Sequence, residues 1–308
     1  MSTLRATQPY APHAGPRRLL ARHPVVAFLI MVYAVTIAVA LLRMQGDPHL
    51  PFDLPLWSAL GHLLGVALPA FLVIGAVRGR AGLRDLARRS FRWRVGTGWY
   101  VVALLGLPTA TMLCASALFG PAPLNALVAG WPLVFTLVLP DLLLRLAVLN
   151  LAEEIGWTGF LQAWLQDRHG PWKACILVEV PFALFHLPDL IVDTGGDLRL
   201  AFLLLGIFAV AQLFGRVVVM WLYNSAQRSL LLVGLFHATY NTTVNRLGPV
   251  FIPGPAETGF WIASSVVAVT AVLMLLLTRG QLAYQPELGS HTAAPPAGGK
   301  PPTYATQA

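Results

Sequence analysis

Four ionisable residues lie in or beside long apolar stretches of the chain: Glu153, Glu154, His186 and His237. An ionisable side chain inside a bilayer costs about 2.5–3.5 kcal/mol on insertion scales, unless it is paired or faces water. Such residues therefore indicate a function more often than simple packing. Carboxylates and imidazoles are also the groups that transfer protons when a water molecule is activated. Together the four residues predict a water-activating site within a membrane.

The local spacing of these residues suggests separate roles. Glu153 and Glu154 are adjacent, so on a helix they point about 100° apart. One carboxylate can then face a reaction centre while the other bonds to a neighbouring helix; the alternative is a helix end with both acids solvated. His237 and Asn241 are four residues apart and share one helix face. They can donate hydrogen bonds to an oxyanion, or simply join two helices at about 0.6 kcal/mol per bond.

Other polar residues in apolar stretches have simpler interpretations. His186 shares a helix face with Phe182 and Glu179, and a lone histidine there would be explained equally well by packing. Asp141 and Arg145 are four residues apart, which favours a structural ion pair. Arg216 has no local partner. Glu154 and Glu179 are its candidate partners on other helices.

Composition places the chain among membrane proteins. It is 56% hydrophobic and 11% charged, whereas soluble domains average about 25% charged residues. The net charge is +8, but the arginines cluster between apolar runs, so the positive-inside rule explains them better than nucleic-acid binding. Cys114 and Cys175 both lie in apolar segments, which does not indicate a disulfide framework.

The hydropathy pattern predicts an all-α polytopic membrane protein with about eight transmembrane helices around a cytoplasm-facing cavity. A span needs about 20 apolar residues. The predicted spans are 24–43, 55–77, 98–119, 127–152, 172–192, 200–222, 229–248 and 258–278. We expect a transmembrane domain over 24–279, a disordered basic leader over 1–23 and a disordered Pro/Ala/Gly-rich tail over 280–308. These boundaries separate Glu153 from His186 in depth, unless the fourth helix continues through Gly156 and Trp164.

The distribution of basic residues predicts the orientation. With eight spans, 16 of the 21 lysines and arginines fall on one side, which places both termini in the cytoplasm of a cell-membrane protein. Seven of them are arginines in segment 78–94. Leu83, Leu86 and Phe91 accompany them, a pattern typical of an amphipathic helix on anionic lipid.

The motifs resemble those of the CPBP family of intramembrane endopeptidases, which includes the CAAX prenyl endopeptidases and the abortive-infection or bacteriocin-immunity proteins. The family pattern is Glu-Glu-x-x-x-Arg, then Phe-x-x-x-His, then His-x-x-x-Asn/Asp. The corresponding residues are Glu153, Glu154, Thr158, Phe182, His186, His237 and Asn241. The likeness in order and spacing covers residues 150–245, and Thr158 stands where the family has arginine.

The resemblance implies a glutamate-type protease that needs no cofactor and acts on a membrane-associated peptide or protein, prenylated or anchored in the membrane. By this analogy Glu153 and His186 activate a water, His237 and Asn241 stabilise the oxyanion, and Glu154 orients the site. The missing arginine leaves Glu154 without its family partner. Arg145 and Arg216 are the candidates to supply the charge.

Three alternatives stay open from the sequence. Glu153, His186 and His237 could bind zinc as a three-ligand catalytic site, although no His-Glu-x-x-His motif is present; metal analysis after chelation would separate this from the metal-free site. A multi-span protein of the same fold could also bind or sequester a peptide without cleaving it, as an immunity protein would. A proton-coupled transporter is the third, but no internal repeat supports it.

Overall fold

The computed structural model describes residues 20–286 and is almost entirely helical. Its only strands in this range form one short antiparallel hairpin, β1 (His49–Leu50) with β2 (Leu54–Pro55). The long helices are α2 (Pro24–Arg43), α4 (Leu68–Ser90), α11 (Pro171–Asp193), α12 (Leu198–Ser225) and α15 (Thr258–Leu277). Shorter helices are α3 (Leu56–His62), α5 (Thr97–Val101), α6 (Leu107–Phe119), α7 (Ala122–Ala129), α8 (Leu139–Arg145), α9 (Leu151–Glu154), α10 (Ala163–His169), α13 (Leu230–Thr242) and α14 (Gly248–Phe251).

Several of these elements join into longer continuous helices through π-helical turns. Within the described part of the chain, seven helices are long and apolar enough to cross a membrane. They are Pro24–Arg43, Leu56–Ser90, Thr97–Phe119, Val134–His169, Pro171–Asp193, Leu198–Ser225 and Thr258–Leu277. The predicted all-α polytopic class is therefore confirmed.

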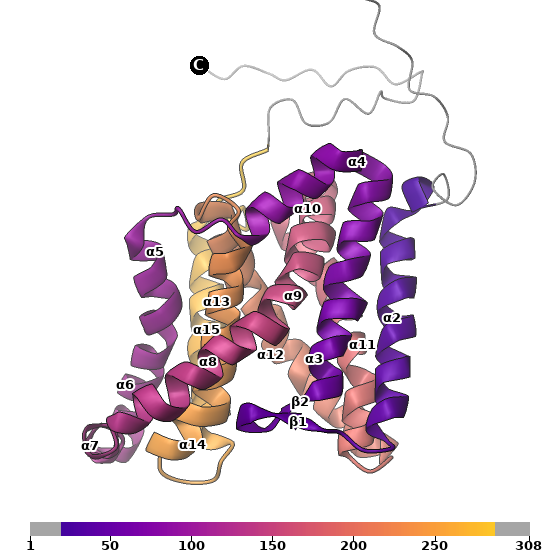
Figure 1. Ribbon diagram of the computed structural model, residues 1–308. Coiled ribbons are helices and arrows are strands. Elements are labelled where there is room, and N and C mark those ends of the chain that lie inside the picture. The colour runs from indigo at the N-terminus through magenta and orange to yellow at the C-terminus, as the bar shows by residue number, and fades with distance from the viewer. Residues whose placement is uncertain (1–19, 287–308) are drawn as a thin grey trace, which may run out of the picture.

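The predicted span 229–248 is helical but is not one of these seven. Elements α13 and α14, joined by Thr243–Leu247, make one helix that runs alongside the other members of the bundle (Figure 1). Polar residues, among them His237, Asn241 and Arg246, make this helix less hydrophobic than a typical span. It is enclosed instead by its neighbours, since most of α13 is buried.

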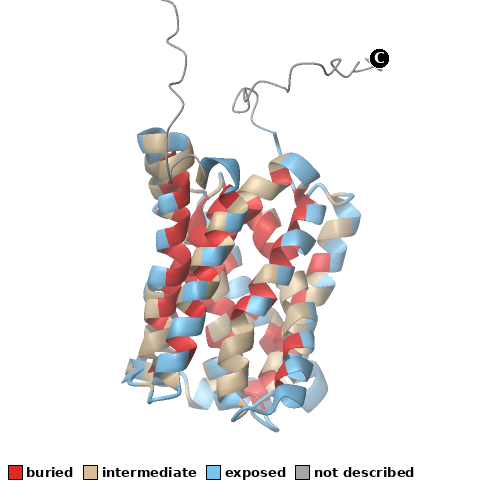
Figure 2. Cartoon of the chain, turned by 90° about the vertical axis from the view of Figure 1, so that its right-hand side faces the viewer, coloured by how far each residue is buried: buried red, intermediate tan, exposed pale blue. Residues whose placement is uncertain are grey.

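The outer surface of the bundle is apolar, as expected where lipid replaces water. Figure 2 shows the buried residues on the inward sides of the helices and the exposed ones facing outward. Many of the outward residues are large and hydrophobic, including Val128, Leu276 and Leu277. Such extensive apolar exposure is rare in soluble monomers. The chain is a multi-pass membrane protein.

The helix that carries Glu153 and Glu154 differs from the predicted span 127–152. It begins at Val134 and continues to His169, so both acids lie near its middle rather than at its end. Segments Leu146–Asn150 and Ile155–Gln162, on either side of the two acids, are π-helical. Such segments widen a helix and are frequent at functional sites. The continued helix removes the difference in depth between Glu153 and His186.

Glycines allow two neighbours to approach this helix closely. A Cβ atom on Gly156 would lie 2.4 Å from Cγ1 of Val66 and 3.0 Å from its carbonyl oxygen. On the other side, a Cβ atom on Gly234 of α13 would lie 3.2 Å from Cα of Leu151. Small residues at such contacts let helix backbones pack directly in membranes. These two contacts set the distance of the acidic segment from the helices that carry His62 and His237.

Replacing Gly156 by alanine is therefore expected to destabilise the protein by about 1–3 kcal/mol, the usual cost of overpacking. The added methyl group would have to displace Val66, whose carbonyl cannot rotate away. Thermal unfolding in detergent measures the effect. Gly98→Ala is the matched control, because no atom lies within 4 Å of the position of its added Cβ. Equal melting temperatures for the two variants would contradict the packing explanation.

The arginine-rich segment forms the second half of the helix Leu56–Ser90. Gly79, with φ of 59°, breaks the helix, and the part that follows lies across one end of the bundle (Figure 1). Arg89 is buried and donates hydrogen bonds to Asp85, Tyr223 and the carbonyl of Gly159, which fixes this part to the bundle. Phe91, just after it, is 65% exposed. Leu86, in contrast, is fully buried against the bundle, and contact of this segment with anionic lipid stays a prediction.

Most of the predicted leader (1–23) and tail (280–308) lies outside the described residues. The beginning of the tail is described, and it packs against the bundle. Leu282 is fully buried and its carbonyl accepts a hydrogen bond from Asn224. Tyr284 donates to Asp167. The described residues of the domain therefore extend to 286, beyond the predicted boundary at 279.

Candidate active site

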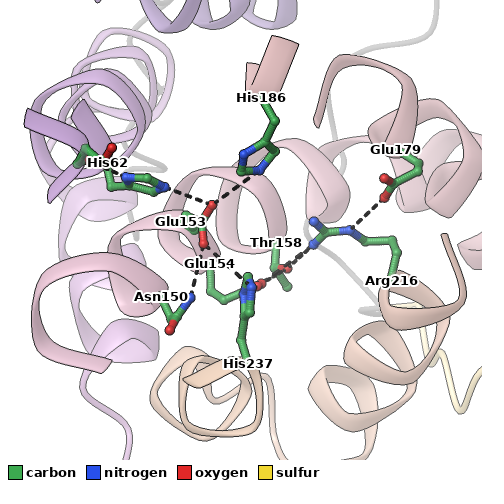
Figure 3. Close-up of polar contacts among 10 residues, drawn as sticks. His62, Asn150, Glu153, Glu154, Thr158, Glu179, His186, Arg216 and His237 are labelled. Atoms are coloured by element: carbon green, nitrogen blue, oxygen red, sulfur yellow. Dashed lines mark hydrogen bonds and ion pairs between the residues drawn. The ribbon is translucent and has the colours of Figure 1, made fainter. Parts of the chain in front are cut away.

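The carboxylate of Glu153 lies at the centre of the site, between three imidazoles and an amide (Figure 3). Its Oε1 atom is 3.1 Å from Nε2 of His62 and 3.9 Å from Nε2 of His186. Its Oε2 atom accepts a hydrogen bond from Asn150 at 3.2 Å and lies 3.7 Å from Nε2 of His237. Glu153 is only 3% exposed. The structure thus brings together three of the predicted residues from three helices.

Glu154 faces another direction and forms a separate network. Its Oε1 atom accepts a hydrogen bond from Nδ1 of His237 at 2.7 Å, and its Oε2 atom accepts one from the hydroxyl of Thr158. Arg216 of α12 donates to Oγ1 of Thr158 at 3.1 Å and lies 3.6 Å from Oε2 of Glu154. The two adjacent side chains therefore point in different directions, as expected from the angle of about 100° between neighbouring helix positions. Glu153 faces the imidazoles, and Glu154 connects helices.

The positive charge beside Glu154 comes from Arg216, one of the two predicted candidates. The other candidate, Arg145, bonds to Asp141 at 2.7 Å and is part of a different cluster. Arg216 also lies 4.0 Å from Glu179, so both acids proposed as its partners are in fact beside it. It is 4% exposed. The guanidinium of Arg216 thus provides, beside Glu154, the positive charge that the family pattern provides with an arginine at position 158.

Aromatic rings surround His186 on α11. The ring of His186 packs edge-on against Phe182, Phe185 and Phe208, with centroid separations of 4.6–5.0 Å. Its Nε2 atom is buried, and no protein group within residues 20–286 forms a hydrogen bond with it. A buried polar nitrogen normally has a partner. Held between three rings and aimed at Glu153, this nitrogen is available to a small polar molecule.

Asn241 lies on the same helix as His237, one turn further on, and is half-buried. In the described part of the chain its side chain has no hydrogen bond to Glu153, Glu154 or His237, and its backbone carbonyl accepts one from the side chain of Asn245. Its placement agrees with the predicted helical spacing. Its role as an oxyanion donor stays a prediction.

His62 is a member of the cluster that the sequence did not indicate. It lies at the end of α3 within a hydrophobic segment and is not part of a local motif. Its side chain contacts Glu153, which lies 91 residues later in the sequence. Its second nitrogen, Nδ1, is 2.5 Å from the carbonyl oxygen of Ser58. No signal in a single sequence singles it out, because the contact depends on how the helix Leu56–Ser90 packs against the helix Val134–His169.

The predicted ion pair between Asp141 and Arg145 belongs to a separate structural cluster. Asp141 is fully buried and bonds to Arg145, to Thr242 at 2.8 Å and to Arg246 at 3.1 Å. Arg246 also donates to the carbonyl of Phe52. These contacts connect α8, the helix of His237 and the β1–β2 hairpin. They are consistent with the structural interpretation.

The residues do not form a metal site in this arrangement. Across residues 20–286, no group of three or more His, Cys, Asp and Glu side chains has the geometry to hold a metal ion. His237 uses Nδ1 on Glu154, and the Nε2 atoms of His237 and His186 lie 3.7 Å and 3.9 Å from the carboxylate oxygens of Glu153. The zinc alternative, with Glu153, His186 and His237 as ligands, stays a prediction that metal analysis after chelation would test.

A pocket opens beside the network of Glu154. Helices α11, α12, α13 and α15 enclose it, and its walls include Glu154, His237, Arg216 and Tyr240. An apolar cavity of about 220 Å³ shares Phe236 and Val267 with this pocket. Glu154 and His237 therefore line a pocket with an adjacent apolar space.

Comparison with known proteins bears on the class of this site. Residues 135–243 match the family model described as Type II CAAX prenyl endopeptidase Rce1-like. The matched segment contains Glu153, His186, His237 and Asn241, so the resemblance inferred from the motifs is confirmed. No curated protein matches the chain. The family described by the model is one of CAAX prenyl endopeptidases, and the match covers 109 of the 308 residues of the chain.

Proposed function

We propose that this chain is an intramembrane endopeptidase that hydrolyses a peptide bond of a membrane-associated substrate without a metal. The observation that supports this best is the contact of Glu153 with His186. Their Oε1 and Nε2 atoms are 3.9 Å apart, too far for a direct hydrogen bond, and Nε2 has no other partner in the described chain. A water molecule beside the pair can bond to both.

In the proposed reaction, Glu153 is the general base and His186 positions the water. The carboxylate takes a proton as the water oxygen attacks the carbonyl carbon of the substrate, which forms a tetrahedral oxyanion. When the oxyanion collapses, the C–N bond breaks and Glu153 returns the proton to the leaving amine. The immediate products are a carboxylic acid and an amine, which exchange a proton to become a carboxylate and an ammonium ion, and the enzyme regains its starting protonation.

His237 is proposed to stabilise the oxyanion through Nε2. Its Nδ1–H donates to Glu154, which already accepts from Thr158 and lies beside Arg216. Nε2 therefore carries a hydrogen only when the ring is an imidazolium, a state that two adjacent carboxylates favour. Donors in a site shielded from water act strongly on developing charge. Glu154, Thr158 and Arg216 thus orient and charge the ring.

Asn241 is proposed as the second oxyanion donor. Replacing it by alanine is expected to lower kcat about 10²–10³-fold, the usual cost of removing one such donor. Single-turnover cleavage by the purified variant measures this. Asn245→Ala is the matched control, since Asn245 lies one turn further along and is exposed. A loss below about tenfold would reassign Asn241 to packing.

The proposal includes the membrane orientation. The surface half of α4, with its arginines, and the described ends of the chain lie at the same end of the bundle in Figure 1. By the positive-inside rule this end faces the cytoplasm. The apolar cavity beside the site would then accommodate an apolar part of the substrate, such as a lipid modification or a membrane-anchored segment.

A comparison of membrane proteomes tests the proposed function in the cell. Cells that carry Glu153→Gln instead of the native protein are expected to accumulate uncleaved membrane-associated precursors. Restoring Glu153 should remove them. If no protein changes its terminus between the two strains, the chain binds rather than cleaves its partners.

A further inference from the structure

We infer that His62 is a positioning residue of the proposed active site, which holds Glu153 in place and keeps it ionised through a charged hydrogen bond. This inference rests on the proposed function, because it assigns a role around the proposed general base. His62 lies outside the segment that matches the family model, which begins at residue 135. Nothing in the motifs of that segment calls for a third histidine.

The hydrogen-bond partners of His62 determine how many protons it carries. Nδ1 is 2.5 Å from the carbonyl oxygen of Ser58, and a carbonyl oxygen only accepts, so Nδ1 carries a hydrogen. Nε2 is 3.1 Å from Oε1 of Glu153. In a neutral ring with its hydrogen on Nδ1, Nε2 would be an acceptor facing a carboxylate, which is also an acceptor. The contact therefore requires one further proton between the two residues.

That proton resides either on His62, as an imidazolium beside a carboxylate, or on Glu153, as a carboxylic acid beside a neutral ring. Only the first state leaves Glu153 able to accept a proton from water. His62 is buried (9% exposed) and Glu153 accepts a second hydrogen bond, from Asn150. An amide donor and an imidazolium both favour the ionised carboxylate. The positive charge of His62 thus offsets the free-energy cost of an ionised Glu153 inside the bundle.

The surrounding helices hold the ring of His62 in this orientation. Phe185 of α11 packs edge-on against it, with ring centroids 5.5 Å apart. The bond to Ser58 lies within its own helix, one turn earlier. The side chain therefore presents Nε2 to Oε1 of Glu153, whereas Asn150 donates to the other oxygen, Oε2 (Figure 3). His186 and His237 remain free to contact water and substrate.

The test compares two replacements of His62 in reconstituted enzyme. Glutamine keeps a side-chain N–H donor and leucine does not. Hydrogen bonds to charged groups contribute about 1.5–3 kcal/mol, so His62→Leu should lower kcat about 10–150-fold with KM little changed. His62→Gln should recover most of this loss. Ser58→Ala is the control, because the variant keeps the carbonyl that His62 uses.

A second measurement needs no substrate. The contact predicts that His62→Leu lowers the melting temperature more in the native background than in Glu153→Leu, where no carboxylate remains. If the native enzyme cleaves and His62→Leu retains its kcat, or if leucine and glutamine behave alike, the positioning role is wrong. If the native protein does not cleave, the proposed function fails, and the melting temperatures alone decide whether His62 and Glu153 are coupled. Equal shifts in both backgrounds would overturn the pairing.

Discussion

Exchanging Glu153 for glutamine is expected to lower kcat about 10²–10⁴-fold, the usual contribution of a positioned general base. Glutamine has nearly the same size and can still accept a hydrogen bond from Asn150, but it cannot take a proton from water. The variant should therefore insert and fold. Cleavage by protein reconstituted in lipid vesicles measures the effect. Glu153 is surrounded by three imidazoles and is proposed to act on the water in the chemical step. The loss should therefore appear in kcat rather than in KM.

Glu257→Gln is the matched control for this experiment. Glu257 is exposed in the loop before α15 and lies outside the proposed site. Its replacement makes the same chemical change without touching the cluster. Turnover by Glu153→Gln at the level of this control would remove the general base from the proposed mechanism.

Replacing Arg216 by methionine is expected to be the second large effect. Breaking a buried ion pair by removing one partner costs about 3–5 kcal/mol, because the other charge is left uncompensated. Glu154 would keep its bonds to Thr158 and His237 but lose the nearby guanidinium. We expect a lower melting temperature and a loss of turnover of at least about 10²-fold as His237 loses its orientation. Arg199→Met, on the exposed part of α12, is the control.

A rescue variant separates a specific role of Arg216 from a general loss of stability. Thr158→Arg in the background of Arg216→Ala would place a guanidinium at position 158, where the family pattern has arginine. We expect this double variant to regain part of the activity that Arg216→Ala loses. If Arg216→Met cleaves like Arg199→Met, the charge beside Glu154 does not contribute to the site.

Local motifs predicted the candidate site better than the boundaries of the helices that carry it. The spacing of Glu153 and Glu154, and the position of His237 four residues before Asn241, depend only on helical geometry. The grouping of Glu153 with His186 and His237 follows once three apolar helices pack together. Arg216 was a candidate because a buried charge requires a partner.

The predicted end of the fourth helix at 152 is wrong for a physical reason, and the alternative that continues it through Gly156 and Trp164 is the one observed. The polar residues from Asn150 to Glu154 resemble a helix end that reaches water, which led to the boundary at 152. In the structure they are satisfied by side chains of other helices, so the helix continues to His169. Pairing across tertiary contacts is invisible in local hydropathy. The same limit applies to His62, whose partner is 91 residues away.

A double-mutant cycle on Glu153 and His186 tests the central claim most directly. The cycle compares kcat for Glu153→Gln, His186→Ala and the double variant in the same vesicles. If both residues act on one water molecule, the double variant should be no slower than the slower single variant, because the second change removes nothing that remains. Losses that multiply, or a His186→Ala variant with native kcat, would show that the two residues do not share the nucleophilic water.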